Sequence, residues 1–294
     1  MKLPFRLAPL ENEGIPPEWT GSGFVVNGQP VNVLRYGANT EGWSSDLTSF
    51  HEKVSGNEHF IDKASRQVAL EQLVKHLKGG LPILLDVGCS SGAMLRSMKD
   101  RFPEATVIGS DCIPEHLESL ASELTGTPIL QFDIVECPLP DESVDAVVML
   151  NVLEHIENDT EAIRQVKRIL KPGGILVLEV PAGPSLYDVY DRYLLHCRRY
   201  SLARLRNLVN GAGFGIIRQS HLGCFLYPLF SLVKRRNQRY LKENSVDHKK
   251  IVEQEIQKTG DNFLLRLIMA LELRMGRYSS YPFGIRCLMT CLRP

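Results

Sequence analysis

The chain has 294 residues, of which 44% are hydrophobic and 23% are charged, and its formal net charge is zero. This length suits one large α/β domain, or one domain with a sizeable insertion, and the composition is ordinary for a soluble globular protein. A net charge of zero provides no global field that would attract nucleic acid, so we expect no nucleic-acid partner.

The N-terminus and the cysteines predict a cytoplasmic protein. The first ten residues, MKLPFRLAPL, contain two prolines and no continuous apolar run, unlike a signal peptide. No stretch reaches the roughly 20 apolar residues that are needed to span a bilayer. The seven cysteines form no CxxC pair and no Cys/His cluster with zinc spacing, so we expect free thiols and no metal site.

The first half of the chain begins with an arm and continues with alternating strands and helices. Residues 1–45 are rich in Gly, Pro and Asn, and we predict that residues 1–60 form an irregular arm with one hairpin that caps the substrate. Apolar residues at helical spacing predict a helix over 61–77, which two glycines end. Strands are then predicted over 83–87, 106–109, 129–132, 144–150 and 175–180, and helices over 92–101, 114–124 and 160–170. Short, mostly unalternated apolar runs indicate strands buried on both faces of a parallel sheet.

The second half of the chain completes this pattern around an insertion. A helix over 201–210 precedes a sixth strand over 214–220, and a seventh strand is predicted over 284–292. Strand and helix in strict turn imply an α/β, Rossmann-like, doubly wound sheet of seven strands. Residues 61–221 and 283–294 would form this domain. Residues 222–282 are too long for a simple connection, and we predict a mostly helical insertion.

A glycine-bearing turn, DVGCSSG, ends the first predicted strand. Glycine lets a ligand approach the backbone closely, and the N-terminus of the next helix directs amides toward that ligand. A carboxylate at Asp86 suits a cationic ligand group, such as an ammonium, and would repel a pyrophosphate. The dinucleotide pattern G-x-G-x-x-G fails because Ser90 stands where its second glycine is needed, which disfavours a nicotinamide cofactor.

Polar residues also close the next three strands. Asp111 follows Gly92 by nineteen residues and ends the second strand, where doubly wound folds bind both ribose hydroxyls. Asp133 and Ile134 follow the third strand, where a carboxylate and an apolar side chain can bond an exocyclic amine and pack on an adenine. Asn151 ends the fourth strand, above the ligand crevice. Each acid could instead cap a turn or a helix.

These motifs carry a family resemblance. DVGCSSG, VIGSD, QFDIVECPLPDESVDAVVMLNVLEHI and ILKPGGILVLEVP resemble, in order and spacing, the motifs of class I S-adenosylmethionine-dependent methyltransferases, in particular the ubiquinone- and menaquinone-type small-molecule branch. The resemblance implies S-adenosylmethionine as the cofactor and S-adenosylhomocysteine as the product. It implies a cofactor site in which Asp86, Gly88, Cys89 and Gly92 surround the methionine part, Asp111 and Cys112 lie at the ribose, Asp133 and Ile134 contact the adenine, and Asn151 lies near the sulfonium.

The resemblance extends more weakly to a D…H-x-R-R-Y-S…A-G-F pattern over residues 191–214, in which Leu195 replaces the usual glycine. His196, Tyr190 and His155 are the candidate catalytic residues, because they flank the predicted pocket in the sequence; His51 and His59 do so too. Methyl transfer requires a base only if the acceptor loses a proton, so no fixed base follows. The Glu-His pair at 154–155 could instead pack at a helix start, and the run 198–200 is expected to frame the entrance of a helix.

The insertion has two interpretations. Its apolar run 222–233 precedes a basic segment, and we favour a lid helix packed on the domain, with a solvated basic end. The alternative is a peripheral membrane contact through 222–239. A second helix would present an apolar stripe that, together with Phe225 and Phe230, roofs a pocket for a large, partly apolar acceptor. The stripe comprises Phe263, Leu264, Leu267, Ile268, Leu271 and Met275.

The predicted function is therefore methyl transfer to a small-molecule acceptor that is lipid-, isoprenoid- or sugar-derived. A noncatalytic cofactor-binding or scaffolding protein and a nicotinamide-dependent oxidoreductase are the alternatives. Product formation with a panel of acceptors separates the first alternative from an enzyme, and a cofactor-binding assay separates the second.

Overall fold

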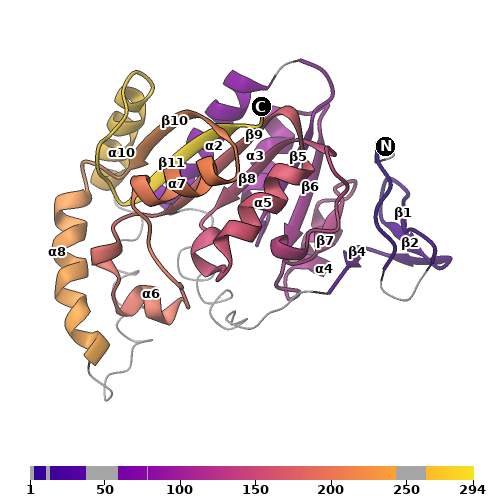
Figure 1. Ribbon diagram of the computed structural model, residues 1–294, viewed down its shortest axis with the longest axis horizontal. Helices are drawn as coiled ribbons and strands as arrows, with labels where there is room; N and C mark the ends of the chain where they lie inside the picture. The colour runs from indigo at the N-terminus through magenta and orange to yellow at the C-terminus, as the bar shows by residue number, and fades with distance from the viewer. Residues whose placement is uncertain (1–2, 11–13, 38–58, 78, 243–262) are drawn as a thin grey trace.

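The computed structural model describes residues 3–10, 14–37, 59–77, 79–242 and 263–294. Its centre is an eight-stranded sheet in the order β10-β11-β9-β8-β5-β6-β7-β4 (Figure 1). The seven predicted strands are all present: β5 (Ile83–Val87), β6 (Thr106–Asp111), β7 (Ile129–Gln131), β8 (Val144–Leu150), β9 (Leu170–Pro181), β10 (Gly215–Leu222) and β11 (Arg286–Leu292). Neighbouring strands from β4 to β9 pair in parallel, whereas β11 is antiparallel to both β9 and β10.

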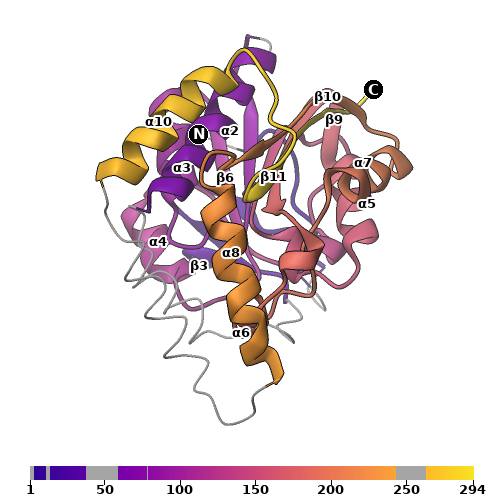
Figure 2. The same ribbon diagram turned by 90° about the vertical axis from the view of Figure 1, so that its left-hand side faces the viewer.

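Helices cover both faces of this sheet, as a doubly wound fold requires. The first face carries α2 (Phe60–His76), α3 (Ala93–Arg101) and α4 (Leu117–Glu123), and the second carries α5 (Asp159–Ile169) and α7 (Leu202–Gly211) (Figure 2). Consecutive strand residues point to opposite faces, so Leu84 packs with the first group of helices and Leu85 with the second. The side chain of Ser201 accepts a hydrogen bond from the amide of Arg204, which confirms the predicted cap of α7.

The eighth strand was not predicted, and it comes from the N-terminal arm. β4 (Val33–Arg35) adds to the sheet beside β7. Before it, β1 (Glu18–Trp19), β2 (Phe24–Val26) and β3 (Gln29–Val31) form a separate antiparallel sheet whose Trp19 and Phe24 rings lie 4.8 Å apart and join the core. This part of the arm lies beyond the β7 edge, far from α8 (Figure 1). Residues 38–58 of the predicted cap, which include His51, lie outside the described residues.

The insertion is helical where it is described. It contains α8 (Tyr227–Asn237), η4 (Gln238–Lys242) and α10 (Phe263–Gly276). α10 packs against α2, and its fully buried Glu272 accepts hydrogen bonds from the amides of Gly223 at 2.6 Å and Phe225 at 3.0 Å. The carboxylate of Glu272 therefore ties α10 to the segment that leads into α8. Among the described residues, no helix is both long enough and apolar enough to cross a bilayer.

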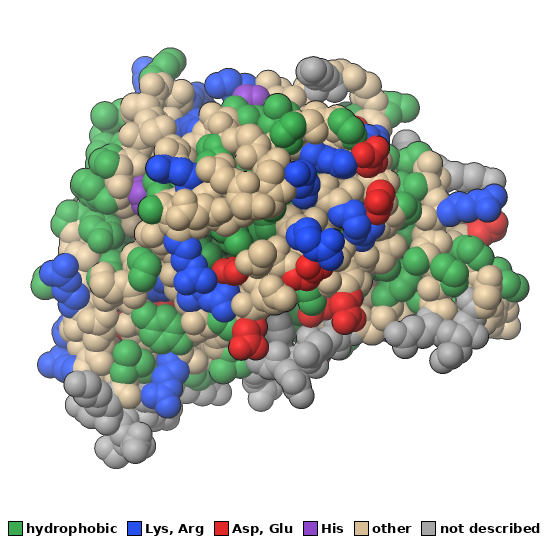
Figure 3. Space-filling model, viewed as in Figure 1, with side chains coloured by type: hydrophobic (Ala, Val, Ile, Leu, Met, Phe, Trp, Pro, Cys, Tyr) green, Lys and Arg blue, Asp and Glu red, His purple; other side chains and the backbone are tan. Residues whose placement is uncertain are grey.

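The predicted apolar roof on α10 is wrong. Five of its six side chains are exposed, with exposed fractions of 46–74%: Phe263, Leu264, Leu267, Leu271 and Met275. The helix instead buries the face with Met269, Glu272 and Gly276. The buried carboxylate of Glu272 fixes this orientation. Apolar periodicity did not indicate this orientation, because the buried face of the helix contains a charged residue. Hydrophobic side chains consequently gather on the outer side of the molecule, over α8 and α10 (Figure 3).

Candidate functional site

The turn after β5 has a backbone that favours glycine. Gly88, Ser90 and Gly92 have left-handed φ values of 75°, 47° and 79°. The amides of Gly88 and Cys89 both donate to the carbonyl of Ser110, which fastens the turn to β6. A Cβ on Gly88 would lie 2.4 Å from Cγ2 of Val152, so no other residue fits there without movement. Ser90 tolerates its strained backbone, and its amide donates to Oδ2 of Asp111 at 2.9 Å.

Asp86 lies at the carboxyl end of β5 with its side chain buried. Its Oδ2 has no hydrogen-bond partner within the described part of the chain. Burial, followed by the nearby charge of Asp111, raises the pKa of Asp86 well above its usual range. A buried carboxyl oxygen normally has a partner, so a cationic ligand group, such as the ammonium of S-adenosylmethionine, fits this position.

Asp111 and Asp133 combine a structural role with the predicted one. Oδ2 of Asp111 accepts from Ser90, and its Oδ1 accepts from the amide of Ile113 at 3.0 Å. Oδ1 of Asp133 accepts from the amide of Val135, which caps η1 (Ile134–Glu136). Each carboxylate oxygen has two lone pairs, so these bonds leave capacity for hydroxyl or amine donors of a ligand.

The apolar and sulfur-containing residues of the predicted cofactor site are mostly buried. Ile134 is buried within the core, and the side chain of Cys89 points into the core beneath the turn. Cys112 is half-buried; burial, followed by the charge of Asp111, raises the pKa of its thiol. Only the backbone of Cys89 therefore belongs to the ligand side of the turn, and burial disfavours the thiolate form of Cys112.

Asn151, at the end of β8, links the cofactor turn to a buried ionic group. Its φ is 55°, its amide donates to the carbonyl of Glu179, and its Nδ2 lies 3.4 Å from Oε1 of Glu179. Glu179 is buried on β9 and accepts from Arg286 at 2.7 Å, and Arg286 also pairs with Asp62 of α2. Four elements thus meet beside Asn151. His59, a minor candidate for the pocket, lies at the start of α2, with its Nδ1 4.0 Å from Oδ2 of Asp62.

The structure brings two of the three candidate catalytic residues together. The rings of His155 and His196 meet edge to face, with centroids 4.6 Å apart. Nδ1 of His196 lies 2.9 Å from Oδ1 of Asp191. Glu154, in η2 (Leu153–His155), is fully buried beside them, and burial raises its pKa to about 8. Burial also lowers the pKa of His196, although the hydrogen bond with Asp191 opposes this shift, so the imidazole is neutral near pH 7.

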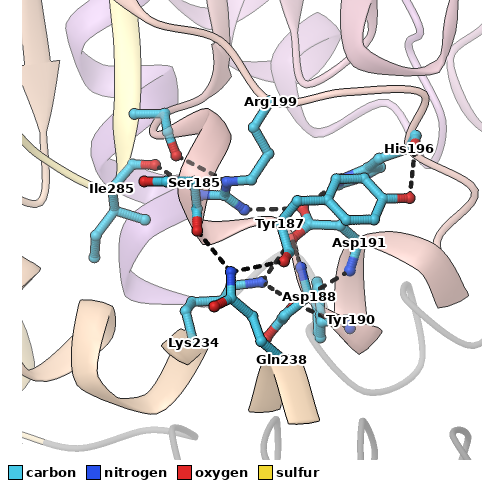
Figure 4. A network of polar contacts seen from close by, with 11 residues as sticks. Ser185, Tyr187, Asp188, Tyr190, Asp191, His196, Arg199, Lys234, Gln238 and Ile285 are labelled. Atoms are coloured by element: carbon cyan, nitrogen blue, oxygen red, sulfur yellow. Dashed lines mark hydrogen bonds and ion pairs between the residues drawn. The ribbon is translucent and has the colours of Figure 1, made fainter. Parts of the chain in front are cut away.

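The third candidate, Tyr190, belongs to an ionic network that the sequence did not reveal. Lys234 of α8 donates to Oδ1 of Asp188 at 2.7 Å and to Oδ2 of Asp191 at 3.1 Å (Figure 4). Asp191 belongs to α6 (Val189–Tyr193), and Asp188 caps this helix. Arg199 donates to Asp191 at 2.9 Å, and the ammonium of Lys234 lies 4.9 Å from the Tyr190 ring centroid. Lys234 is buried, so its assignment to a solvated basic end was wrong.

Two members of the run 198–200 lie at the start of α5, whereas Arg199 pairs with Asp191. Arg198 and Tyr200 both donate to Oδ2 of Asp159, the first residue of that helix, at 3.0 and 2.9 Å. A groove of about 630 Å³ lies elsewhere, along α2 and α3. None of the predicted site residues lines this groove, and we assign it no part in the chemistry.

These features together define a class of protein. A doubly wound sheet with one antiparallel strand, a glycine turn after its first strand and acids at the ends of the next strands is a Rossmann-like fold built to bind a nucleoside-containing cofactor. Residues 85–178 match a family described as "Methyltransferase domain".

The similar proteins agree with this match. A demethylmenaquinone methyltransferase from Deinococcus radiodurans is 30% identical over 51% of this chain and 63% of that protein. A probable S-adenosylmethionine-dependent methyltransferase from Mycolicibacterium smegmatis is 28% identical over 54% of this chain and 61% of that protein. The matches thus span less than two thirds of either relative. A putative sarcosine dimethylglycine methyltransferase from Galdieria sulphuraria has the same fold, with a TM-score of 0.58 at 15% identity over 85% of this chain and 98% of the other.

Residues 85–178 thus match a methyltransferase domain, as the motifs predicted, and the proteins similar to this chain include S-adenosylmethionine-dependent methyltransferases.

Proposed function

We propose that the protein transfers a methyl group from S-adenosylmethionine to a small-molecule acceptor that binds beside the ends of β8 and β9. The observation that supports this most is a set of buried carboxyl oxygens without partners in the described chain. They belong to Asp86 on the cofactor side, and to Glu154, Glu179 and Asp188 on the other side. Val152 lies against the Gly88 turn. Buried polar groups without partners are rare, so this arrangement favours polar ligands on both sides.

The residues would act mainly by position. S-adenosylmethionine, when bound, supplies a methyl group that its sulfonium already activates. Asp86 would hold the ammonium, Asp111 the ribose hydroxyls, and Asp133 the adenine amine. The buried side chains around Asn151 exclude water and orient the acceptor. If the acceptor is a hydroxyl or an amine, His196, held by Asp191, can take its proton, with His155 and Tyr190 as the other candidates.

The acceptor we propose is partly apolar. One relative is named as acting on demethylmenaquinone, and α8 contributes the Phe230 ring, whose centroid lies 5.6 Å from both the Arg199 guanidinium and the Lys234 ammonium. This ring stands next to the ionic network and offers an apolar wall beside it. Leu229 and Leu232 of the same helix have exposed fractions of 64% and 66%, and they could contact a lipid surface that carries such an acceptor.

The test combines cofactor titration with turnover on an acceptor panel. Calorimetry should show S-adenosylmethionine binding without NADH binding, and mass spectrometry should show a methylated product from a prenylated quinol. Cofactor binding without product across the panel would favour a scaffolding role, and NADH binding would favour an oxidoreductase.

Two double variants locate the acceptor. Replacing Phe225 and Phe230 by Ser should weaken acceptor turnover and leave cofactor affinity within about twofold, under roughly 0.5 kcal/mol. The matched variant with Leu229→Ser and Leu232→Ser should leave turnover of a soluble acceptor unchanged. A loss in that variant only for acceptor in anionic vesicles would show a membrane contact.

A further inference from the structure

A cluster of three side chains beside Asn151 has the composition of a metal site. Glu154, His155 and His196 each place a ligand atom within 4.8 Å of the others. The centroids of the two imidazole rings are 4.6 Å apart. Two imidazoles that coordinate one zinc ion, with Zn–N distances of about 2.1 Å, have centroids roughly 5 Å apart. The separation of the rings therefore suits a shared ion with little movement of either side chain.

Glu154 supplies a second, independent observation. Its side chain is fully buried, and neither carboxyl oxygen makes a hydrogen bond with another residue in the described part of the chain, although its own backbone amide stabilises the charged form. A buried carboxyl normally has a hydrogen bond or an ionic partner. Arg286 and Arg199 influence it through space without bonding to it. A cation held between Glu154 and the two imidazoles would be the partner that this carboxyl lacks.

His196 is already oriented as metal-binding histidines usually are. Its Nδ1 lies 2.9 Å from Oδ1 of Asp191, and such a carboxylate contact fixes the ring so that Nε2 can bind an ion. Arg199 and Lys234 hold Asp191 in turn, at 2.9 and 3.1 Å. The imidazole is therefore held by a rigid, buried support.

The charges around the cluster also favour a divalent ion. Around the cluster, five carboxyls, of Asp62, Glu154, Glu179, Asp188 and Asp191, outnumber three cations, of Arg199, Lys234 and Arg286. A divalent cation would add positive charge beside these carboxyls.

We propose that Glu154, His155 and His196 bind one Zn²⁺ ion and leave a coordination position for an oxygen of the acceptor. Two imidazoles and one carboxylate are a ligand set that catalytic zinc sites use, whereas Mg²⁺ and Ca²⁺ prefer oxygen ligands. The role of the ion in catalysis rests on the proposed methyl transfer, but its binding does not. With zinc bound, His155 and His196 would act as ligands and not as bases, and an acceptor hydroxyl on zinc would lose its proton to water more readily. The acceptor oxygen would then bond to the methyl carbon while the methyl–sulfur bond breaks and sulfur keeps the electron pair.

The test measures zinc on the full-length chain after removal of metal by a chelator. Equilibrium dialysis followed by elemental analysis should give one Zn²⁺ per wild-type chain. Glu154→Gln and His155→Gln should each weaken zinc binding at least tenfold. Glu157→Gln is the matched control, because its exposed carboxyl lies three residues from Glu154. Cys197→Ser removes the exposed thiol beside His155 and should bind zinc like the wild type.

The outcomes separate the zinc site from the proposed function. Absence of stoichiometric zinc from the folded wild-type chain would overturn the proposal, as would Glu154→Gln binding zinc like the wild type. Loss of zinc in Cys197→Ser would also overturn it, because the ion would then belong to a thiol. Circular dichroism shows whether each variant is folded, and titration with S-adenosylmethionine should give an affinity within twofold of the wild type in Glu154→Gln. If the wild type bound zinc but not S-adenosylmethionine, the proposed function would fail while the metal site stood.

Discussion

Replacing Gly88 by Ala tests the cofactor turn most directly. The new Cβ would meet Cγ2 of Val152 at 2.4 Å, and the residue would have to keep a φ of 75°. A left-handed backbone costs an L-residue roughly 1–2 kcal/mol, and forcing a methyl group into a packed site costs roughly 1–3 kcal/mol. The free energy of unfolding should therefore fall by about 2–5 kcal/mol. Cofactor affinity should fall at least about tenfold, because the turn must move away from its position against β6.

In the structure, a side chain at position 88 would first collide with Val152, whereas the sequence suggested that it would collide with the cofactor. A double-mutant cycle with Val152→Ala separates the two contributions, because it removes the methyl group that the new Cβ would strike. In that background the glycine replacement should cost only the backbone part, about 1–2 kcal/mol. The assays are urea denaturation and calorimetric titration with S-adenosylmethionine. An unfolding midpoint and an affinity for Gly88→Ala equal to those of the wild type would refute the reasoning, and an unchanged penalty in the cycle would refute the clash.

Three further replacements test neighbouring parts of the site. Asp111→Ala should lower cofactor affinity at least about tenfold, since each lost bond to a carboxylate is worth roughly 1.5–3 kcal/mol, and unchanged calorimetric affinity in a folded variant would contradict the assignment. Cys89→Ala should leave affinity nearly intact and reduce stability by about 1 kcal/mol in urea denaturation; a large loss of affinity would mean that the side chain reaches the ligand. Lys234→Met should destabilise the chain by roughly 3–5 kcal/mol, because it leaves the buried carboxylate of Asp188 without its cation and leaves Asp191 with Arg199 alone. The exposed Arg235→Met is its control and should change stability by less than about 0.5 kcal/mol.

The class of fold and the cofactor could be predicted from the sequence because they depend on residues that are close together in the chain. A strand, the turn that follows it and the acid at its end are contiguous, so Asp86 and Gly88 could be assigned from one short segment. The strands from β5 to β9 are covered on both faces, so their apolar runs need no partner to be recognised. The parallel order then followed from strict alternation with helices, and the strand order of the structure agrees with it.

Burial and pairing between distant segments were decided only by the tertiary structure. β4 has only three residues, so the sequence does not distinguish it from a loop. It is a strand because it pairs with β7. Lys234 belongs to a run of three cations, and the sequence does not show which of them is buried. In the structure Lys234 is buried because it pairs with the carboxylates of Asp188 and Asp191. His155 and His196 are 41 positions apart in the sequence, too far for a local pattern to pair them, and only the tertiary structure brings their rings together. Local patterns determined the scaffold and the cofactor turn, whereas long-range packing assembled the polar site because its members come from separate elements.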